Sequence, residues 1–258
     1  MQYIGIRGHR GSGKNSISYL LGRTIDYFIK NKVIKSDYDS LYKSWVDDIM
    51  NDDNVLYSAD TEKVYFDSFA STLRIMLYLL MGIPEIYMKQ DYYKDHLIIN
   101  LKDFSNQVYD KIPSTIKLQT REDLYNNLSK TGPIVITQDT YMTLREFILY
   151  FGYDIMQRFF GINVWIKSIK ACENFYENIW DGYDYRIYTD VKTPSEVTYI
   201  LNQNGVIVQV VRPGKIKDQG YDKLNKDGRV DFIITVSGDL MSIKDQIIDV
   251  ASQIINLQ

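Results

Sequence analysis

The chain has 258 residues, of which 45% are hydrophobic and 24% are charged, and its net charge of -3 corresponds to a pI near 5.5. This composition is typical of a folded globular protein and excludes a disordered or fibrous chain. The slightly acidic balance argues against a protein that coats nucleic acid, because binding to the phosphate backbone requires a basic surface.

The single cysteine, Cys172, cannot form a disulfide within the chain, which favours a reducing compartment. No basic segment precedes an apolar one at the start of the sequence, so we expect no secretory signal. The longest apolar run, residues 75–81, is far shorter than the ~20 residues that span a bilayer. We therefore expect a cytoplasmic protein without a membrane partner, in the cytoplasm of a host cell if the chain is viral.

Strand-like and helix-like segments alternate along the chain, which predicts βαβ units and a mostly parallel sheet of about five strands. The predicted strands are residues 3–7, 63–67, 185–190, 206–211 and 231–236. The predicted helices are residues 14–30, 70–81, 143–160, 165–179, 194–204 and 240–255. Residues 84–140 fit this alternation poorly. We expect one α/β domain over residues 1–258, with a largely helical insertion at about 84–140 that covers the substrate; a solvated excursion without a role is the alternative.

The most specific motif is the loop at residues 8–16, which reads Gly-His-Arg-Gly-Ser-Gly-Lys-Asn-Ser between an apolar strand and an amphipathic helix. This context is typical of a P-loop, in which glycines let backbone N–H groups point at phosphate oxygens beside a helix N-terminus. Lys14 is expected to reach the β- and γ-phosphates. Asn15 stands where Ser or Thr is usual and Ser16 follows, an offset similar to that of adenylate kinase. A glycine-rich turn that binds nothing is the alternative.

A second group of candidate residues follows the strand predicted at residues 185–190. Asp190 ends that strand, and ligands of open α/β sheets bind at this edge, so Asp190 is a candidate for the Mg²⁺ shell. Glu196 lies three residues after Thr193, with Pro194 at the first helical position, a spacing that also fits a capping box. Capping and a role in the site can coexist for Glu196.

The helix predicted at residues 143–160 carries an apolar face at helical spacing. Arg145, Leu149 and Gly152 fall on a neighbouring stripe. A guanidinium group there can bind a phosphate bidentately, and a glycine allows a ligand to approach the backbone. An exposed arginine on an ordinary amphipathic helix is the alternative.

Three segments, residues 65–74, 143–165 and 190–214, resemble the deoxynucleoside monophosphate kinases of tailed phages. With the glycine-rich loop, the resemblance covers the N-terminal part and most of the chain after Met142, but not the insertion. Several positions differ from the residues usual in that family: Asn15, Arg74, Leu149, Tyr153 and Lys192. Arg74 and Lys192 keep the charge and change the geometry of a phosphate contact. Leu149 and Tyr153 indicate altered base specificity.

The resemblance implies a three-layer P-loop kinase fold, transfer of the ATP γ-phosphate to a deoxynucleoside monophosphate, Mg²⁺ as the metal and a homodimer. The residues implied to bind ATP are Arg10, Gly11, Ser12, Gly13, Lys14, Asn15 and Ser16. Those implied to bind the acceptor are Arg74, Arg145, Gly152 and Trp165. The catalytic residues would be Lys14, Arg145, Asp190, Lys192 and Glu196, and the metal would be held, directly or through water, by Ser16 and Asp190. Core packing is the alternative role of Trp165.

Two other functions remain open. One is a P-loop kinase for another small acceptor, such as dephospho-coenzyme A or a sugar acid. The other is a non-catalytic regulatory protein that binds nucleotides, which needs no acceptor-side arginine such as Arg145. A motor or DNA-remodelling ATPase is disfavoured because the chain is short and acidic. Asp139 competes with Asp190 for the metal-side role, and Arg121 and residues 89–94 are candidates for a closing lid.

Overall fold

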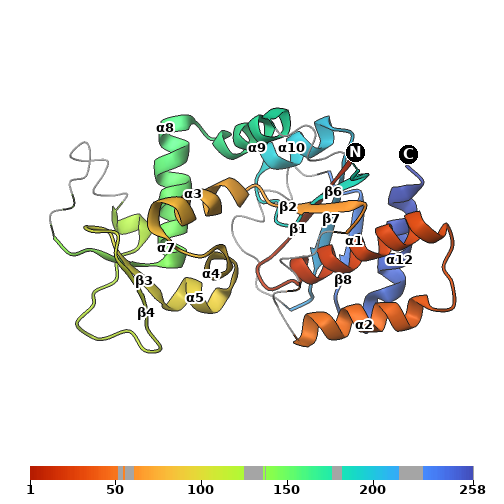
Figure 1. Cartoon of the computed structure of the whole chain (residues 1–258), viewed down its shortest axis with the longest axis horizontal. Coiled ribbons are helices and arrows are strands. Elements are labelled where there is room, and N and C mark those ends of the chain that lie inside the picture. Colours follow the sequence, from red (N-terminus) through yellow and green to blue (C-terminus); the bar gives the residue numbers. More distant parts are fainter. Residues whose placement is uncertain are drawn as a thin grey trace. The chain divides into compact units, whose positions relative to one another are not determined.

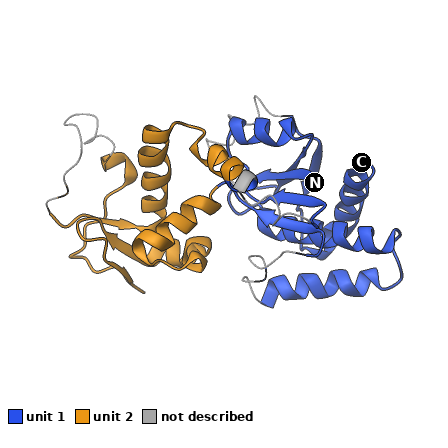
Figure 2. Ribbon diagram, turned by 45° about the horizontal axis from the view of Figure 1, so that its top comes forward, with its two compact units in different colours: residues 1–69, 172–258 blue, residues 70–171 orange. Residues whose placement is uncertain are grey.

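The computed structural model describes residues 1–51, 55, 61–124, 136, 138–175, 182–214 and 229–257. The chain divides into two units, one formed by Met1–Phe69 with Cys172–Gln258 and the other by Ala70–Ala171 (Figure 2). The second unit therefore extends beyond the insertion expected at residues 84–140 in both directions. Each unit is described by itself.

The first unit contains a five-stranded sheet in which all neighbouring strands are parallel, in the order β2-β6-β1-β7-β8. The strands are β1 (Gln2–Gly8), β2 (Val64–Asp67), β6 (Tyr185–Tyr188), β7 (Val206–Val211) and β8 (Phe232–Thr235). These strands confirm all five strand predictions made from the sequence. The central strand β1 pairs with β6 on one side and with β7 on the other, so the strand order reverses at β1.

Helices cover both faces of this sheet (Figure 1). Ile4 and Ile6 of β1 belong to the same buried core as Ile17 and Leu20 of α1, which packs beside α12. A Cβ added to Gly5 would point to the opposite face of the sheet, where it would lie 2.5 Å from Ile200 Cδ1 of α10. The helices of this unit are α1 (Lys14–Asn31), α2 (Tyr38–Asn51), α10 (Pro194–Asn202), α12 (Lys244–Ile255) and the short 3-10 helix η4 (Met241–Ile243). The unit is thus an α/β structure with helices on both sides of a parallel sheet.

Helix α2 is an addition to the elements predicted from the sequence. Tyr38, Tyr42, Val46 and Ile49 form its buried face at helical spacing. The hydroxyl of Tyr42 donates a hydrogen bond of 3.0 Å to the carbonyl oxygen of Leu240, so this buried polar group is satisfied. The spacing is present in the sequence, but two of its four positions are tyrosines, which a simple apolar pattern does not count.

The second unit combines helices with a three-stranded antiparallel sheet in the order β4-β3-β5. Its strands are β3 (Leu97–Asn100), β4 (Asn106–Val108) and β5 (Tyr141–Thr143). Its helices are α3 (Ser71–Met81), α4 (Glu85–Lys89), α5 (Asp91–His96), α7 (Leu144–Leu149), the π-helix η2 (Tyr150–Gln157), α8 (Arg158–Phe160) and the start of α9 (Val164–Phe175). Within residues 84–140 the structure thus has the strands β3 and β4 beside the helices α4 and α5. All four residues of β3 are buried, and so short an apolar run has no period that separates strand from helix.

The helix predicted over residues 143–160 is present, but its middle part is wound as a π-helix. A Cβ added to Gly152 in η2 would lie 2.8 Å from Leu73 Cδ2 of α3, so the glycine allows these two helices to pack closely. Of the apolar residues 134–137 that precede Asp139, only Ile136 lies within the described part of the chain.

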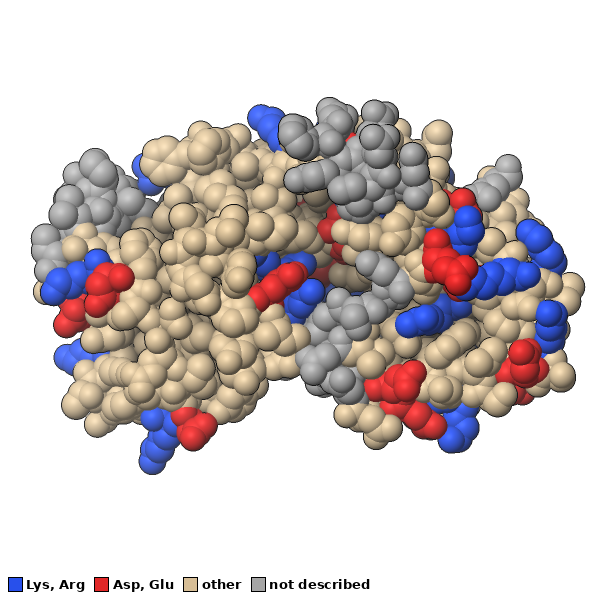
Figure 3. Space-filling view, viewed as in Figure 1, with Lys and Arg blue, Asp and Glu red and all other residues tan. Residues whose placement is uncertain are grey.

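Acidic and basic side chains lie next to one another on the face of each unit that Figure 3 shows. This mixture agrees with the small net charge of -3. Within the residues that the structure describes, no helix is both long and apolar enough to cross a membrane.

Gly205 provides a test of how tightly α10 and β7 approach β1. A Cβ at this position would lie 2.5 Å from the carbonyl oxygen of Tyr3 and 2.8 Å from that of Ile200, and neither backbone atom can move without moving its element. We expect Gly205→Ala to lower the free energy of unfolding in urea by about 1–3 kcal/mol.

The control is Gly238→Ala, whose new Cβ would meet only the side chain of Ser242, with 3.1 Å to its Oγ. We expect this variant to stay within about 0.5 kcal/mol of the wild type. Equal losses in the two variants would show that close packing at Gly205 is not the cause.

Candidate functional site

The glycine-rich loop joins the carboxyl end of β1 to the first turn of α1. Gly11 and Gly13 have positive φ angles of 74° and 92°, a region that favours glycine. A Cβ at Gly8 would lie 2.5 Å from the carbonyl oxygen of Val210, so a larger residue does not fit there. Gly13 is the N-cap of α1, and no described side chain caps that helix end. The loop thus leads into a helix N-terminus without a side-chain cap among the described residues, an arrangement that suits an anion.

Lys14 and Ser12 are the polar side chains inside this loop. The Lys14 ammonium donates hydrogen bonds of 2.8 and 2.9 Å to the carbonyl oxygens of Gly8 and His9. Ser12 is 0% exposed, and its Oγ has no hydrogen-bond partner among the described residues. A buried hydroxyl without a partner is costly. The loop thus holds a cation and an unsatisfied donor, which suits an anion with several oxygens.

The other predicted residues of the loop lie toward its surface. Arg10, Gly11 and Asn15 are exposed, whereas Ser16 is half-buried in the first turn of α1. The hydroxyl of Ser16 lies two positions after Lys14 on the same helix, which is the arrangement expected from the sequence.

Asp190 lies in the turn after β6, the strand next to β1. Its Oδ2 is 2.7 Å from Lys192 Nζ, and its Oδ1 is 3.9 Å from Lys14 Nζ. The N–H of Val191 donates to the carbonyl oxygen of Ile6 at 2.9 Å, which fixes this turn against β1. The structure therefore brings Lys14, Asp190 and Lys192 together at the carboxyl ends of two adjacent strands, where the strand order reverses. Ligands of open α/β sheets bind at such positions.

Glu196 forms the capping box that was one of its two roles predicted from the sequence. Thr193 Oγ1 accepts a bond of 3.3 Å from the Glu196 N–H, and Glu196 Oε2 accepts bonds of 2.6 and 2.9 Å from the N–H groups of Lys192 and Thr193. The residue is 8% exposed. Burial is the main cause that raises the pKa of Glu196, and the nearby charge of Asp190 also raises it. The two backbone hydrogen bonds lower it, and the resulting pKa is about 6. Glu196 thus shapes the turn that carries Asp190.

The predicted acceptor-side residues Arg74, Arg145, Gly152 and Trp165 lie in the second unit. Arg145 binds the carboxylate of Asp95 through Nε at 2.6 Å and through NH2 at 3.1 Å. Its NH2 group also donates to Asp91 at 3.0 Å. Both acids belong to α5, so the arginine connects α7 to α5.

Gly152 and Trp165 contribute to the core of the second unit. Trp165 is 7% exposed and packs in the same cluster as Leu73 and Phe147. The space above Gly152 is taken by Leu73, with Trp165 Cζ2 at 3.9 Å from the position of an added Cβ. Core packing was one of the two roles that the sequence left open for Trp165.

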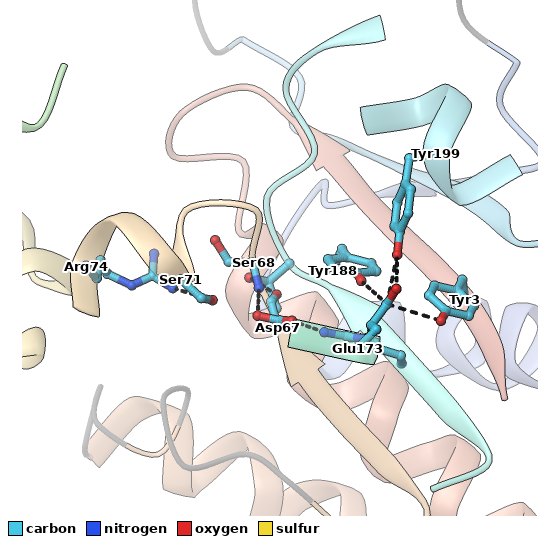
Figure 4. Close-up of polar contacts among 10 residues, drawn as sticks. Tyr3, Asp67, Ser68, Ser71, Arg74, Glu173, Tyr188 and Tyr199 are labelled. Carbon is cyan, nitrogen blue, oxygen red and sulfur yellow. Dashed lines mark hydrogen bonds and ion pairs between the residues drawn. The ribbon is translucent and has the colours of Figure 1, made fainter. Parts of the chain in front are cut away.

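A buried ionic network in the first unit has no counterpart among the residues singled out from the sequence. Arg186 of β6 is 1% exposed and donates to Asp67 at the end of β2 and, at 2.6 Å, to Glu173 of α9. Tyr199 and Tyr3 donate to the same Glu173 carboxylate at 2.7 and 3.2 Å (Figure 4). An arginine inside an otherwise apolar strand indicates such a network, because charged residues are rarely buried without partners.

Within the described part of the chain, no three His, Cys, Asp or Glu side chains gather in a way that could hold a metal ion. A divalent ion at Asp190 would therefore depend on ligand oxygens and water. This is how Mg²⁺ is usually held beside phosphates, with one or two protein oxygens in its shell.

No protein-family model matches the chain, and no curated protein matches its sequence.

The buried carboxylate of Glu196 predicts a pH dependence of stability. Its pKa is about 6 in the folded protein and 4.5 in an ordinary peptide, so the folded state binds the proton more tightly. Ionising Glu196 therefore lowers stability as the pH rises from about 4.5 through about 6. Glu196→Gln keeps an oxygen acceptor for the two N–H groups and cannot ionise. We expect the free energy of unfolding of this variant, relative to that of the wild type, to increase by on the order of 1–2 kcal/mol as the pH rises from 4.5 to 7.

The measurement is urea unfolding of both proteins at pH 4.5, 5.5 and 7. Both proteins keep Asp190 and Lys192, so the substitution at position 196 is the one difference between them. A difference that does not change with pH would contradict the raised pKa.

Proposed function

We propose that the protein is a P-loop phosphotransferase that moves the γ-phosphoryl group of ATP to the phosphate of a deoxynucleoside monophosphate, giving ADP and the deoxynucleoside diphosphate. The observation that carries the proposal is that Lys14 and Asp190 follow two adjacent parallel strands, β1 and β6, with the lysine at the end of a glycine-rich loop and 3.9 Å from the carboxylate. A lysine and an acid at this edge of the sheet suit the binding of a polyphosphate and its metal ion.

The residues of the loop fit the β- and γ-phosphates of ATP. Gly11 and Gly13 adopt positive φ angles, and the first turn of α1 has no side-chain cap. Lys14 binds two neutral carbonyl oxygens, which a phosphate can replace because its negative charge attracts the ammonium group more strongly than a neutral oxygen does. The buried Ser12 hydroxyl would gain the partner that the described residues do not provide.

Asp190 and Ser16 are the residues that would hold Mg²⁺, directly or through water. When bound, the ion would neutralise charge on the phosphates. Lys192 pairs with Asp190 and keeps its carboxylate oriented in the turn after β6. Glu196 holds the backbone of the same turn.

Phosphoryl transfer requires little covalent chemistry from the protein. A phosphate acceptor is already an oxygen anion near neutral pH, so no general base has to remove a proton from it. Its oxygen forms a bond to the γ-phosphorus while the bond to the β–γ bridging oxygen breaks and ADP leaves with the electron pair. The chain has to orient the two phosphates and neutralise their charge, and the cations suited to this task are Lys14 in the first unit and Arg74 and Arg145 in the second.

The acceptor class rests on the resemblance of residues 65–74, 143–165 and 190–214 to phage deoxynucleoside monophosphate kinases. A glycine-rich loop alone would equally fit a kinase for another small acceptor. A panel of acceptors therefore decides between these possibilities.

The test of the proposed function is ADP release in a coupled assay with ATP, Mg²⁺ and each of the four deoxynucleoside monophosphates or their ribose counterparts. We expect release that depends on at least one deoxynucleotide. Lys14→Ala should lower kcat by on the order of 100-fold, because it removes a contact to the transferred charge. Thermal unfolding checks that the variant is folded. A folded Lys14→Ala variant with wild-type turnover, or no acceptor-dependent release at all, would refute the proposal.

Asp190→Asn tests the metal-side role separately. The substitution preserves the shape of a half-buried side chain and removes its charge, so we expect activity to fall on the order of 100-fold with little change in thermal stability. The matched control is Asp139→Asn, because Asp139 is the competing acid and pairs with Lys102 at 3.8 Å. Near-normal activity of Asp190→Asn at saturating Mg²⁺, with a large loss in Asp139→Asn, would transfer the role to Asp139.

A further inference from the structure

Four basic side chains of the second unit gather on helices α3, α4, α5 and α7, and each is largely covered. Their side chains are between 16% and 24% exposed: Arg74 16%, Lys89 21%, Lys94 22% and Arg145 24%. Lysine and arginine are mostly exposed in proteins, because burial removes the charge from water. A group of covered cations therefore indicates a place where negative charge is bound.

Acidic side chains of the same unit occupy this group. Arg74 Nε and Lys89 Nζ lie 3.2 and 3.0 Å from one and the same oxygen, Oε1 of Glu85. Two cations are thus held by one carboxylate oxygen on α4.

The second half of the group repeats this arrangement on α5. Arg145 NH2 and Lys94 Nζ lie 3.0 and 3.4 Å from one oxygen, Oδ1 of Asp91. Asp95 accepts two further bonds from the Arg145 guanidinium, which is the bidentate geometry that a phosphate also offers. Lys94 Nζ also donates to the carbonyl oxygen of Lys89 at 3.0 Å, which joins the two halves.

The seven side chains together carry four positive and three negative charges, so an excess of one positive charge remains. A phosphomonoester dianion brings two negative charges and three terminal oxygens on one atom. It can accept from the fork of Arg145 and from an ammonium group at the same time, whereas Asp91 and Asp95 have to approach as two separate carboxylates.

We infer that Lys94 joins Arg145 in a subsite for a phosphomonoester dianion, and that Asp91 and Asp95 occupy this subsite until the phosphate replaces them. The inference rests on the proposed function only in assigning this phosphate to the acceptor nucleotide. It adds a residue, Lys94, that binds the phosphate and two, Asp91 and Asp95, that compete with it.

The experiment measures binding, not turnover. Isothermal titration of the full chain at pH 7 compares each deoxynucleoside monophosphate with its deoxynucleoside. The dissociation constant of the deoxynucleoside divided by that of the monophosphate gives a ratio that reports the contribution of the phosphate to binding. Inorganic phosphate is titrated as well, so that a subsite for free phosphate is distinguished from one that needs the nucleotide.

We expect Lys94→Ala to reduce the ratio on the order of tenfold, because a charge-assisted hydrogen bond is lost. Asp95→Asn should instead increase it, by about threefold or more, since a competing charge is removed. Asp91→Asn is the second variant if Asp95→Asn does not fold. The controls are Lys43→Ala and Asp47→Asn, an exposed pair 2.9 Å apart on α2, which should leave the ratio unchanged.

Weaker or unchanged phosphate binding in folded Asp95→Asn, no effect of Lys94→Ala, or no phosphate binding by the wild type would overturn the inference. The proposed function fails independently. If the ratio responds as expected but ADP is never released, the subsite stands and the kinase activity does not. If ADP release depends on the acceptor but neither substitution changes the ratio, the activity stands and the subsite does not.

Discussion

A guanidinium group that water does not reach holds the first unit together. Arg186 binds Asp67 of β2 and Glu173 of α9, and the same Glu173 carboxylate receives the hydroxyl groups of Tyr3 and Tyr199. Three strands of the sheet and the helices α9 and α10 are thus joined through one buried charge. Removing one partner of a buried ion pair typically costs about 3–5 kcal/mol, because the other charge remains without compensation. The network ties β6, whose following turn carries Asp190, to β2 and α9.

Two arginines with similar ion pairs differ in how far they are buried. Arg186 and Arg145 each bind two carboxylates, but Arg186 is 1% exposed and Arg145 is 24% exposed. The partners of Arg186 are covered as well, so no anion from solution can replace them. Asp91 and Asp95 are largely exposed, and exposed ion pairs contribute little stability. An arginine held in this second way is suited to exchange its partner for a ligand.

The long helices could be predicted because their apolar residues repeat with a clear period, the strands of the first unit because apolar runs alternate with those helices, and the loop at residues 8–16 because its glycines and lysine stand in a fixed order. The antiparallel sheet of the second unit could not, because its short strands do not alternate with long helices in this way. Arg145 was found as a candidate, but its partners Asp91 and Asp95 lie about fifty positions away along the chain and are set by tertiary packing. The partners of Arg186 are likewise set by tertiary packing, although an arginine inside an apolar strand indicates that it has partners.

The position of β1 also has a consequence for how the chain reaches this structure during synthesis. Gln2 pairs with Tyr185 and Ile4 with Val206, so both neighbours of the first strand come from the last third of the chain. Contacts between residues so far apart in sequence form late, because closing the long loop between them costs entropy before the contacts add stability. The strand that leads into the glycine-rich loop is therefore synthesised well before either of its neighbours and is among the last to find its place. Until then Ile4 and Ile6 need protection from other chains, which a chaperone can give.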